Sequence, residues 1–179
     1  DRYGDAIYAS AEWSEYLPDW HPWEDYRKSY AANVDLGGGV FLTQIHPLNY
    51  LNFLFGDINK TLVQKHASKS LNIDVDDTAD ILIEFESGVS GHVHVDFIQK
   101  PRVHKLKIVT NLGRFEWDCH QNKLIFLALD GTIETFDNLG FERNDMFLEM
   151  LSKFIEDVKS GRPSDFGVAQ AVAELKLLL

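Results

Sequence analysis

The chain has 179 residues, 45% of them hydrophobic and 12% aromatic, and a formal net charge of −11. This size and apolar content suit one domain with a real core and exclude disorder. An acidic chain without a Lys/Arg cluster argues against a nucleic-acid partner. The sequence has no apolar run of about 18 residues, so no membrane helix is expected. The single cysteine, Cys119, favours a reducing, cytoplasmic location.

The first third of the chain predicts a strand, an aromatic loop and a helix. Residues 7–13 are predicted to form the strand. Residues 16–30 are rich in Trp, Pro, Tyr and charge without a clean period, which indicates a structured loop or a short irregular helix. A glycine triplet at 37–39 then breaks the chain. Residues 47–55 predict a helix, because proline is tolerated in a first turn and glycine follows the last residue.

Between residues 61 and 136 the apolar period changes to two, which is typical of strands. Strands are predicted at residues 61–68, 78–85, 89–97, 104–110, 113–118, 123–129 and 132–136.

The hairpin after residue 85 has two conceivable registers. A two-residue turn at 87–88 would put the apolar sets of its strands on opposite faces. A three-residue turn with Gly88 left-handed pairs Phe85 with Val89 and makes one face uniformly apolar, so we prefer it. The other face then places Asp80 opposite His94.

Apolar residues at helical spacing between 146 and 158 predict a helix with a core-facing stripe, which Asn144 or Asp145 would cap and Gly161 would end. Residues 168–179 predict a second helix. The chain begins without methionine and stops within this apolar run, ends that we expect of a fragment. Together the elements predict an α+β fold: a mainly antiparallel, open-faced sheet with helices on one face. Because that sheet leaves one face uncovered, we expect a homo-oligomer to form through the open face.

The segment from residue 20 to 56 holds the most informative chemistry. Glycines let a ligand approach the backbone, so Gly38 and Gly39 are candidate cofactor contacts. His46 precedes Pro47 at the start of the predicted helix, where the helix dipole disfavours the imidazolium. A neutral imidazole can accept a hydroxyl proton as a carbinol loses hydride to a nicotinamide. Alternatively, the glycines only form a turn and His46 only caps the helix.

These residues carry a resemblance to a known family. The residues that carry it are Gly37-Gly38-Gly39, His46-Pro47-Leu48-Asn49-Tyr50 and Leu54-Phe55-Gly56. Their order resembles the signature of the Gfo/Idh/MocA family, which comprises the glucose–fructose oxidoreductases, inositol dehydrogenases and their relatives. Residues 16–27 are similar to the loop before the triplet in one branch, residues 91–97 and 100–102 to its sheet, and residues 147–155 to its closing helix.

The resemblance implies a fold like the C-terminal domains of dihydrodipicolinate reductase and glucose–fructose oxidoreductase. In this family an N-terminal Rossmann domain binds NAD or NADP and supplies a lysine from Glu-Lys-Pro. The C-terminal domain binds a sugar, cyclitol or nucleotide-sugar-like polyol and builds oligomers. This chain has neither Gly-x-Gly-x-x-Gly nor Glu-Lys-Pro. Residues 1–179 are therefore expected to be a single substrate-binding and oligomerisation domain, without a cofactor and inactive in isolation.

The family's catalytic histidine corresponds to His46, but two neighbouring positions depart from the family pattern. Leu42 and Thr43 stand where an acidic residue is usual, and Asn49 replaces the aspartate three residues after the histidine. The proton relay would then be weakened, or His46 would orient the substrate, with Thr43 and Asn49 as substrate contacts. The departures motivate an alternative function, a non-catalytic sugar-binding or oligomerisation module.

The aromatic loop supplies further candidate substrate contacts: His21, Tyr26, Arg27 and Tyr30. Aromatic rings stack on sugar faces, and arginine makes forked contacts with carboxylate or phosphate. The alternative is a buried loop in which Arg27 pairs with a neighbouring acid, Glu24 or Asp25.

His92, His94 and Asp96 alternate along one strand face near Asp80. Two histidines at this spacing can bind zinc, but no further ligands stand at convincing positions, so no metal is expected. We favour a polar face that is solvated or packs against a second subunit.

Overall fold

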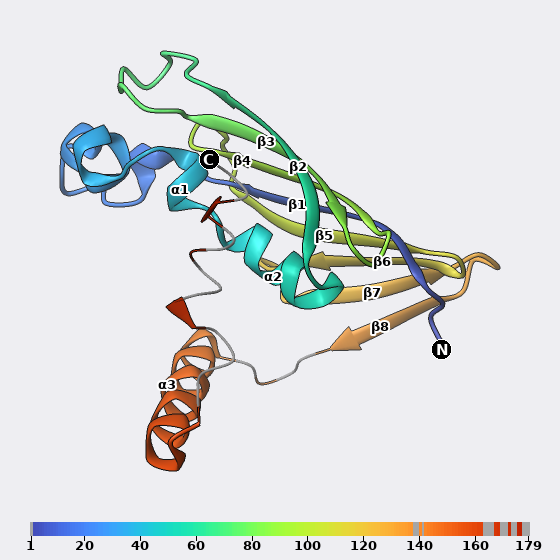
Figure 1. The fold of residues 1–179 in the computed structure, drawn as a ribbon. Coiled ribbons are helices and arrows are strands. Elements are labelled where there is room, and N and C mark those ends of the chain that lie inside the picture. Colours follow the sequence, from blue (N-terminus) through green and yellow to red (C-terminus); the bar gives the residue numbers. More distant parts are fainter. Residues whose placement is uncertain are drawn as a thin grey trace. The chain divides into compact units, whose positions relative to one another are not determined.

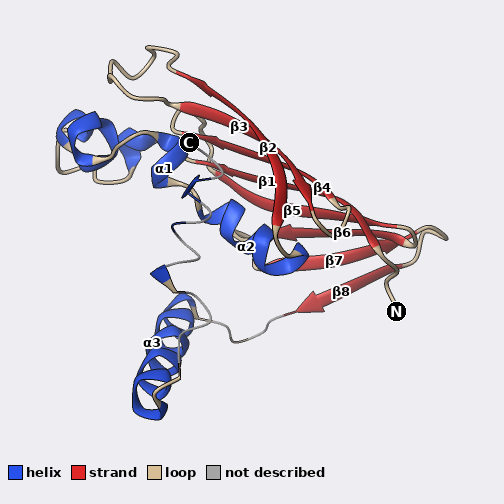
Figure 2. Ribbon diagram, in the orientation of Figure 1, coloured by secondary structure: helices blue, strands red, loops and turns tan. Residues whose placement is uncertain are grey.

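The computed structural model describes residues 2–137, 140, 142–162, 167–168, 172 and 175–176. The chain forms two compact units, residues 1–136 and 137–179, which are described separately. Within its described residues the first unit is an eight-stranded sheet with helices on one face, which confirms the predicted α+β class (Figures 1 and 2).

Every predicted strand is present, and its ends lie within three residues of those predicted. The strands are β1 Ala6–Ser14, β2 Ile58–His66, β3 Thr78–Phe85, β4 Ser90–Asp96, β5 Val103–Thr110, β6 Gly113–Asp118, β7 Lys123–Ala128 and β8 Ile133–Asp137. Their spatial order is β2-β3-β4-β1-β5-β6-β7-β8. The first strand thus lies in the middle of the sheet, parallel to β4 and antiparallel to β5.

The β3–β4 hairpin has the register that the apolar pattern predicts. Asp80 lies opposite His94, and the backbone N–H of Phe85 donates to the carbonyl of Val89 at 3.0 Å. Gly88 has a φ of 84°, a conformation that residues with a Cβ rarely adopt. This register puts every second residue of β3 into the core, where Ile81 and Ile83 are buried.

Two helices, α1 Val40–Thr43 and α2 His46–Phe55, lie on one face of the sheet (Figure 1). Leu48 and Leu51 of α2 are fully buried, and each buried leucine contributes roughly 1.5–3 kcal/mol. The central strand β1, which α2 contacts, carries Ala9 and Ala11. Their small buried side chains leave room for the helix to approach the sheet. The helix begins at His46, one residue earlier than predicted, and α1 was not predicted.

The aromatic loop folds as short 3-10 turns rather than as one helix. Within residues 17–36 they are Leu17–Asp19, Tyr26–Lys28, Tyr30–Ala32 and Val34–Leu36. Gly37, with a left-handed φ of 76°, ends the last turn and directs the chain into α1.

The second unit contains α3, Arg143–Ser160. Glu142, not Asn144 or Asp145, is the N-cap: it forms a capping box with Asp145, whose side chain accepts from the Glu142 N–H at 2.9 Å. Gly161 ends the helix as predicted. Within its own unit the apolar stripe of α3 is exposed, and its packing as core stays a prediction. Most of the predicted helix 168–179 lies outside the described residues.

In the described part of the chain, no helix is both long and apolar enough to cross a membrane.

Candidate functional site

His46 is placed at the first residue of α2, on the helix-covered side of the sheet. Its imidazole lies against the indole of Trp13, with 5.3 Å between ring centroids. Trp13 is the penultimate residue of β1, so the central strand holds the ring that supports His46. The predicted position of this histidine at a helix start is confirmed, although its catalytic role is not tested by the geometry.

A second imidazole, which the sequence did not single out, completes this cluster. His104 of β5 is the cross-strand partner of Trp13, and the rings stack at 4.3 Å with only 10° between their planes. Trp117 of β6 meets His104 edge-on at 5.1 Å. Burial, with smaller effects from His120 and His46, lowers the pKa of His104 to about 4, so its ring is neutral at pH 7.

Tyr50 brings α2 to the same cluster. It lies four residues after His46, one helical turn further along, and its ring is 6.3 Å from that of His104. Burial raises the pKa of the Tyr50 hydroxyl well above its usual value, so the group is protonated. Two sequence signals point to Tyr50, its i, i+4 spacing from His46 and its place in the run 46–50 that carries the family resemblance.

Several polar atoms in this cluster are closed to solvent and have no hydrogen-bond partner among the described residues. They are Trp13 Nε1, Tyr50 OH and His104 Nε2; Thr43 Oγ1, at the end of α1, is also buried without a described partner. A buried polar atom without a partner costs roughly 1–3 kcal/mol, and folded proteins keep few of them. We call His46, Trp13, Tyr50 and His104 the histidine–indole cluster.

Asp76 fixes the short helix that precedes His46. Its backbone carbonyl accepts from the N–H of Val40, and its carboxylate accepts from the N–H of Phe41, each at 2.9 Å. These bonds satisfy N–H groups that a helix start leaves unpaired. They place Thr43 at the end of α1, three residues before His46. Asn49 lies in the first turns of α2, where its N–H meets the Ile45 carbonyl at 3.4 Å.

Packing alone explains two glycines of the triplet. A Cβ on Gly38 would stand 2.5 Å from the Tyr30 carbonyl oxygen. Gly39 has a φ of 104°, and a Cβ there would stand 2.6 Å from a carboxylate oxygen of Asp76. Both positions therefore require glycine without any ligand, and the predicted cofactor contacts of Gly38 and Gly39 stay predictions.

The aromatic loop forms a separate hollow of about 230 Å³, lined in part by His21, Tyr26 and Tyr30. The hydroxyl of Tyr26 donates to the Leu71 carbonyl at 2.8 Å, which anchors the loop. Arg27 makes a forked pair with Asp25 at 2.8 and 3.0 Å, the alternative weighed from the sequence. The structure thus brings three of these four candidates together, in a different cluster from His46, and their contact with substrate stays a prediction.

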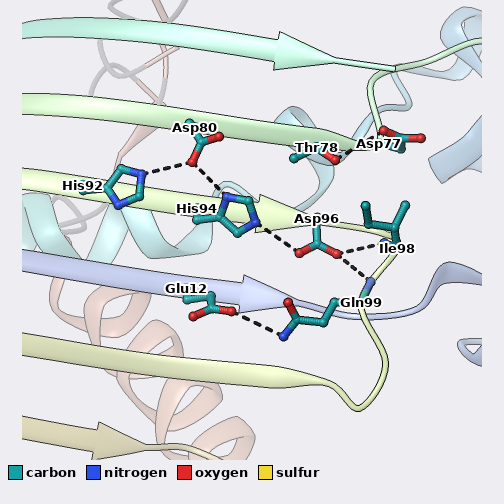
Figure 3. Close-up of polar contacts among 9 residues, drawn as sticks. All are labelled: Glu12, Asp77, Thr78, Asp80, His92, His94, Asp96, Ile98 and Gln99. Carbon is teal, nitrogen blue, oxygen red and sulfur yellow. Dashed lines mark hydrogen bonds and ion pairs between the residues drawn. The ribbon is translucent and has the colours of Figure 1, made fainter. Parts of the chain in front are cut away.

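The face of the sheet opposite α1 and α2 carries a chain of charged hydrogen bonds (Figure 3). Asp80 lies 3.0 Å from His92 Nε2 and 2.8 Å from His94 Nδ1, and the second nitrogen of His94 lies 3.2 Å from Asp96. The bond to Asp96, then the bond to Asp80, raise the pKa of His94 to about 9 against the effect of burial. His94 is therefore an imidazolium at pH 7.

Asp96 is the buried end of this chain of bonds. Burial favours its neutral form, but His94 and the backbone N–H groups of Ile98 and Gln99 hold the pKa of its carboxyl below the usual value. Both nitrogens of His94 face carboxylates, and an imidazolium has no free lone pair for a metal. Across the described residues, no group of three or more His, Cys, Asp or Glu side chains is arranged to hold a metal ion.

A shallow hollow of about 480 Å³ lies over the same face. Its polar lining includes Ser10, Glu12, His92, His94, Lys105 and Lys107.

Comparison with known proteins gives a family and a fold. The family model described as the GFO/IDH/MocA C-terminal domain matches residues 1–116. No curated protein matches the chain significantly. One similar structure is a putative NADPH-dependent oxidoreductase from Desulfitobacterium hafniense, with a TM-score of 0.79 and 14% identity over 98% of this chain and 53% of that one.

Two other similar structures are sugar dehydrogenases. Levoglucosan dehydrogenase in complex with NADH and levoglucosan has a TM-score of 0.77 and 14% identity, over 91% of this chain and 52% of its own. The UDP-N-acetylglucosamine 3-dehydrogenase of Acidithiobacillus ferrooxidans has a TM-score of 0.72 and 15% identity, over 98% and 53%. The chain spans about half the length of each structure. At these identities the structures show a shared fold, and the family model, which includes His46, shows that the chain belongs to the GFO/IDH/MocA C-terminal domain family.

Proposed function

We propose that this chain is the substrate-binding half of an NAD(P)-dependent oxidoreductase that acts on a sugar, cyclitol or nucleotide-sugar-like polyol. The observation that carries the proposal is the position of His46, which lies within the family match, at the start of α2 and in contact with Trp13. The similar dehydrogenases support it, because levoglucosan and UDP-N-acetylglucosamine are both sugars with oxidisable carbinol carbons. The chain spans half their length, which fits a Rossmann domain elsewhere in the full-length protein.

In the proposed reaction His46 handles the proton. A bound nicotinamide supplies the acceptor for the hydride that leaves the carbinol carbon. His46 accepts the proton of the carbinol hydroxyl, so a carbonyl is formed and charge is conserved. Trp13 restricts the imidazole by ring contact, and Asn49 offers a neutral amide where the family has a carboxylate.

The cofactor itself would be held mainly by the Rossmann domain, because this chain lacks a dinucleotide-binding motif. A cofactor could contact Gly38 and Gly39 only through their backbone, and the packing around these residues explains the glycines without a cofactor. The exposed single cysteine is consistent with a reducing, cytoplasmic setting.

The test uses the full-length protein with NAD and NADP in turn. D-Glucose, myo-inositol, levoglucosan and UDP-N-acetylglucosamine are added, and reduced nicotinamide is followed by absorbance. We expect turnover of one substrate class, and a loss of at least about 100-fold in kcat for His46→Ala with cofactor affinity and unfolding unchanged. Full turnover in His46→Ala would refute the catalytic role.

A non-catalytic sugar-binding or oligomerisation module is the second candidate. The observation that favours it is the absence of acidic side chains at Thr43 and Asn49, which leaves His46 without a carboxylate in its relay. Protein that binds cofactor and sugar but shows no turnover would support this candidate. In that case Asn49→Asp should raise turnover, because a carboxylate beside an imidazole stabilises the imidazolium.

We also propose that the open sheet face forms a homo-oligomer. Its outer strands present an apolar cross-strand pair, Leu62 and Leu82, of which both members are exposed. Light scattering should show a dimer or a larger assembly. The substitution Leu82→Asp should dissociate this assembly, because it would bury a charge in the contact between copies. A monomeric wild-type protein at high concentration would contradict the proposal.

A further inference from the structure

The histidine–indole cluster has polar atoms that neither the fold nor the proposed proton transfer uses. Tyr50 OH and His104 Nε2 are closed to solvent, and the described residues offer them no partner. The rings of Tyr50 and His104 lie 6.3 Å apart, and Trp13 contacts the rings of both His104 and His46. We propose that Tyr50 and His104 are specificity-determining residues, which bind hydroxyl groups of the sugar whose reacting carbon lies at His46. This inference rests on the proposed function.

The placement of the two groups argues for a ligand role. Tyr50 comes from α2, His104 from β5 and Trp13 from β1, so three separate elements converge on one polar cluster. In a purely structural core, apolar side chains could occupy the same space without leaving polar atoms unpaired. Polar groups that break this rule in a folded protein are concentrated at functional sites.

The protonation states define the chemistry of the ligand. Because burial lowers the pKa of His104 to about 4 and raises that of Tyr50, both groups are neutral at pH 7. A neutral imidazole nitrogen and a phenol hydroxyl pair well with sugar hydroxyls, which both donate and accept. The flanking indoles of Trp13 and Trp117 offer ring faces and edges for sugar C–H groups. The cluster thus fits a neutral polyhydroxylated ring better than a phosphate or carboxylate.

The ligand must also open the cluster. Since Tyr50 OH and His104 Nε2 are both covered in the free domain, a sugar reaches them only if neighbouring rings move apart. Two tryptophans, Trp13 and Trp117, contact His104 directly. Binding should therefore change tryptophan fluorescence, which provides a readout independent of turnover.

The experiment removes each polar atom while keeping the ring. Tyr50→Phe and His104→Phe are made in the full-length protein, with Tyr8→Phe on the opposite face as the matched control. The four sugars named above are titrated by tryptophan fluorescence and calorimetry, and NAD(P) affinity is measured in parallel. We expect sugar binding about tenfold weaker in both cluster variants, the loss of about one hydrogen bond each. Cofactor affinity and Tyr8→Phe should match wild type.

Stability measurements make the result decisive. Removing a buried, unpaired polar atom should leave the unfolding midpoint unchanged or higher, so weaker binding cannot be ascribed to a damaged fold. If His104→Phe does not fold, Tyr50→Phe alone decides. Stable variants that bind sugar like wild type would overturn the inference while leaving the oxidoreductase proposal intact. If the wild-type protein binds a sugar but does not turn it over, the oxidoreductase proposal fails. The sugar affinities of the variants would then still test the inference. A wild-type protein that binds none of the sugars would overturn both.

Discussion

The charged network on the open sheet face should make folding stability depend on the protonation of His94. The folded-state pKa of His94 is raised from 6.5 to about 9, chiefly by its bond to Asp96. Because its pKa is raised on folding, His94 contributes stability that is fully present below its unfolded-state pKa of about 6.5. That stability is lost as pH rises through 9. One pKa unit corresponds to about 1.4 kcal/mol, so the shift sets an upper limit of roughly 3 kcal/mol.

Solvent screening reduces this limit. The His94 side chain is 29% exposed and that of Asp80 is 45% exposed, whereas Asp96 is 3% exposed. We therefore discount the contribution of the Asp80 pair and expect about 1–2 kcal/mol from the buried bond to Asp96.

The assay is urea unfolding of wild type and His94→Gln between pH 6 and 10. The difference in unfolding free energy should be largest near pH 6 and should shrink by about 1–2 kcal/mol toward pH 10. Asp96→Asn is the matched variant: its amide oxygen can still accept from the N–H groups of Ile98 and Gln99, but its charge is gone. It should flatten the pH dependence and lower the pKa of His94 measured by NMR. A wild-type minus His94→Gln difference that stays constant with pH would refute the reasoning.

Three further predictions test the segment before His46 and the aromatic loop. Asp76→Ala should destabilise the protein by about 1.5–3 kcal/mol in urea, because a charged bond to a backbone N–H of α1 is lost, whereas the exposed Asp74→Ala should be neutral. Gly38→Ala should lower the unfolding free energy by about 2 kcal/mol or more, because the added Cβ overpacks against backbone carbonyls. Gly37→Ala should lower it by only about 1 kcal/mol, because Gly37 has a positive φ but open space around it. Equal decreases in Tm for the two variants would contradict this. Arg27→Ala should leave the unfolding midpoint unchanged, since its ion pair is exposed, while an increase in KM would support substrate contact by this loop.

Local patterns predicted most of the sheet. The period of two located the strands, and the need for one apolar face selected the register that puts Asp80 opposite His94. These features depend on residues near each other in sequence, where one shift of register moves every side chain to the wrong face. The position of β1 between β4 and β5 was not predictable in this way, because no local signal encodes pairing across more than 70 residues.

The same limit explains what sequence reasoning missed at the site. His46 was identified because its neighbours carry a recognisable order, and Tyr50 shares its helix. His104 becomes visible only when β5 pairs with β1, which brings its ring onto Trp13. The helix α1 was missed for a similar reason, since its first N–H groups are satisfied by Asp76, which lies 35 residues after Phe41.

The two faces of the sheet differ in how far their polar groups are already paired. The open face has a hollow of about 480 Å³, and several charged groups on this face are already paired: His94 with two carboxylates, Lys105 with Asp118 at 3.6 Å, and Arg114 with Glu116. A ligand entering there would have to displace bonds that the fold already makes. The helix-covered face has polar atoms that the described residues leave without partners, gathered around His46. Because unpaired buried groups destabilise the free domain and gain most from a new partner, they support the proposal that the substrate is recognised on the helix-covered face. The paired charges of the open face are compatible with the proposal that it packs against a second copy of the chain.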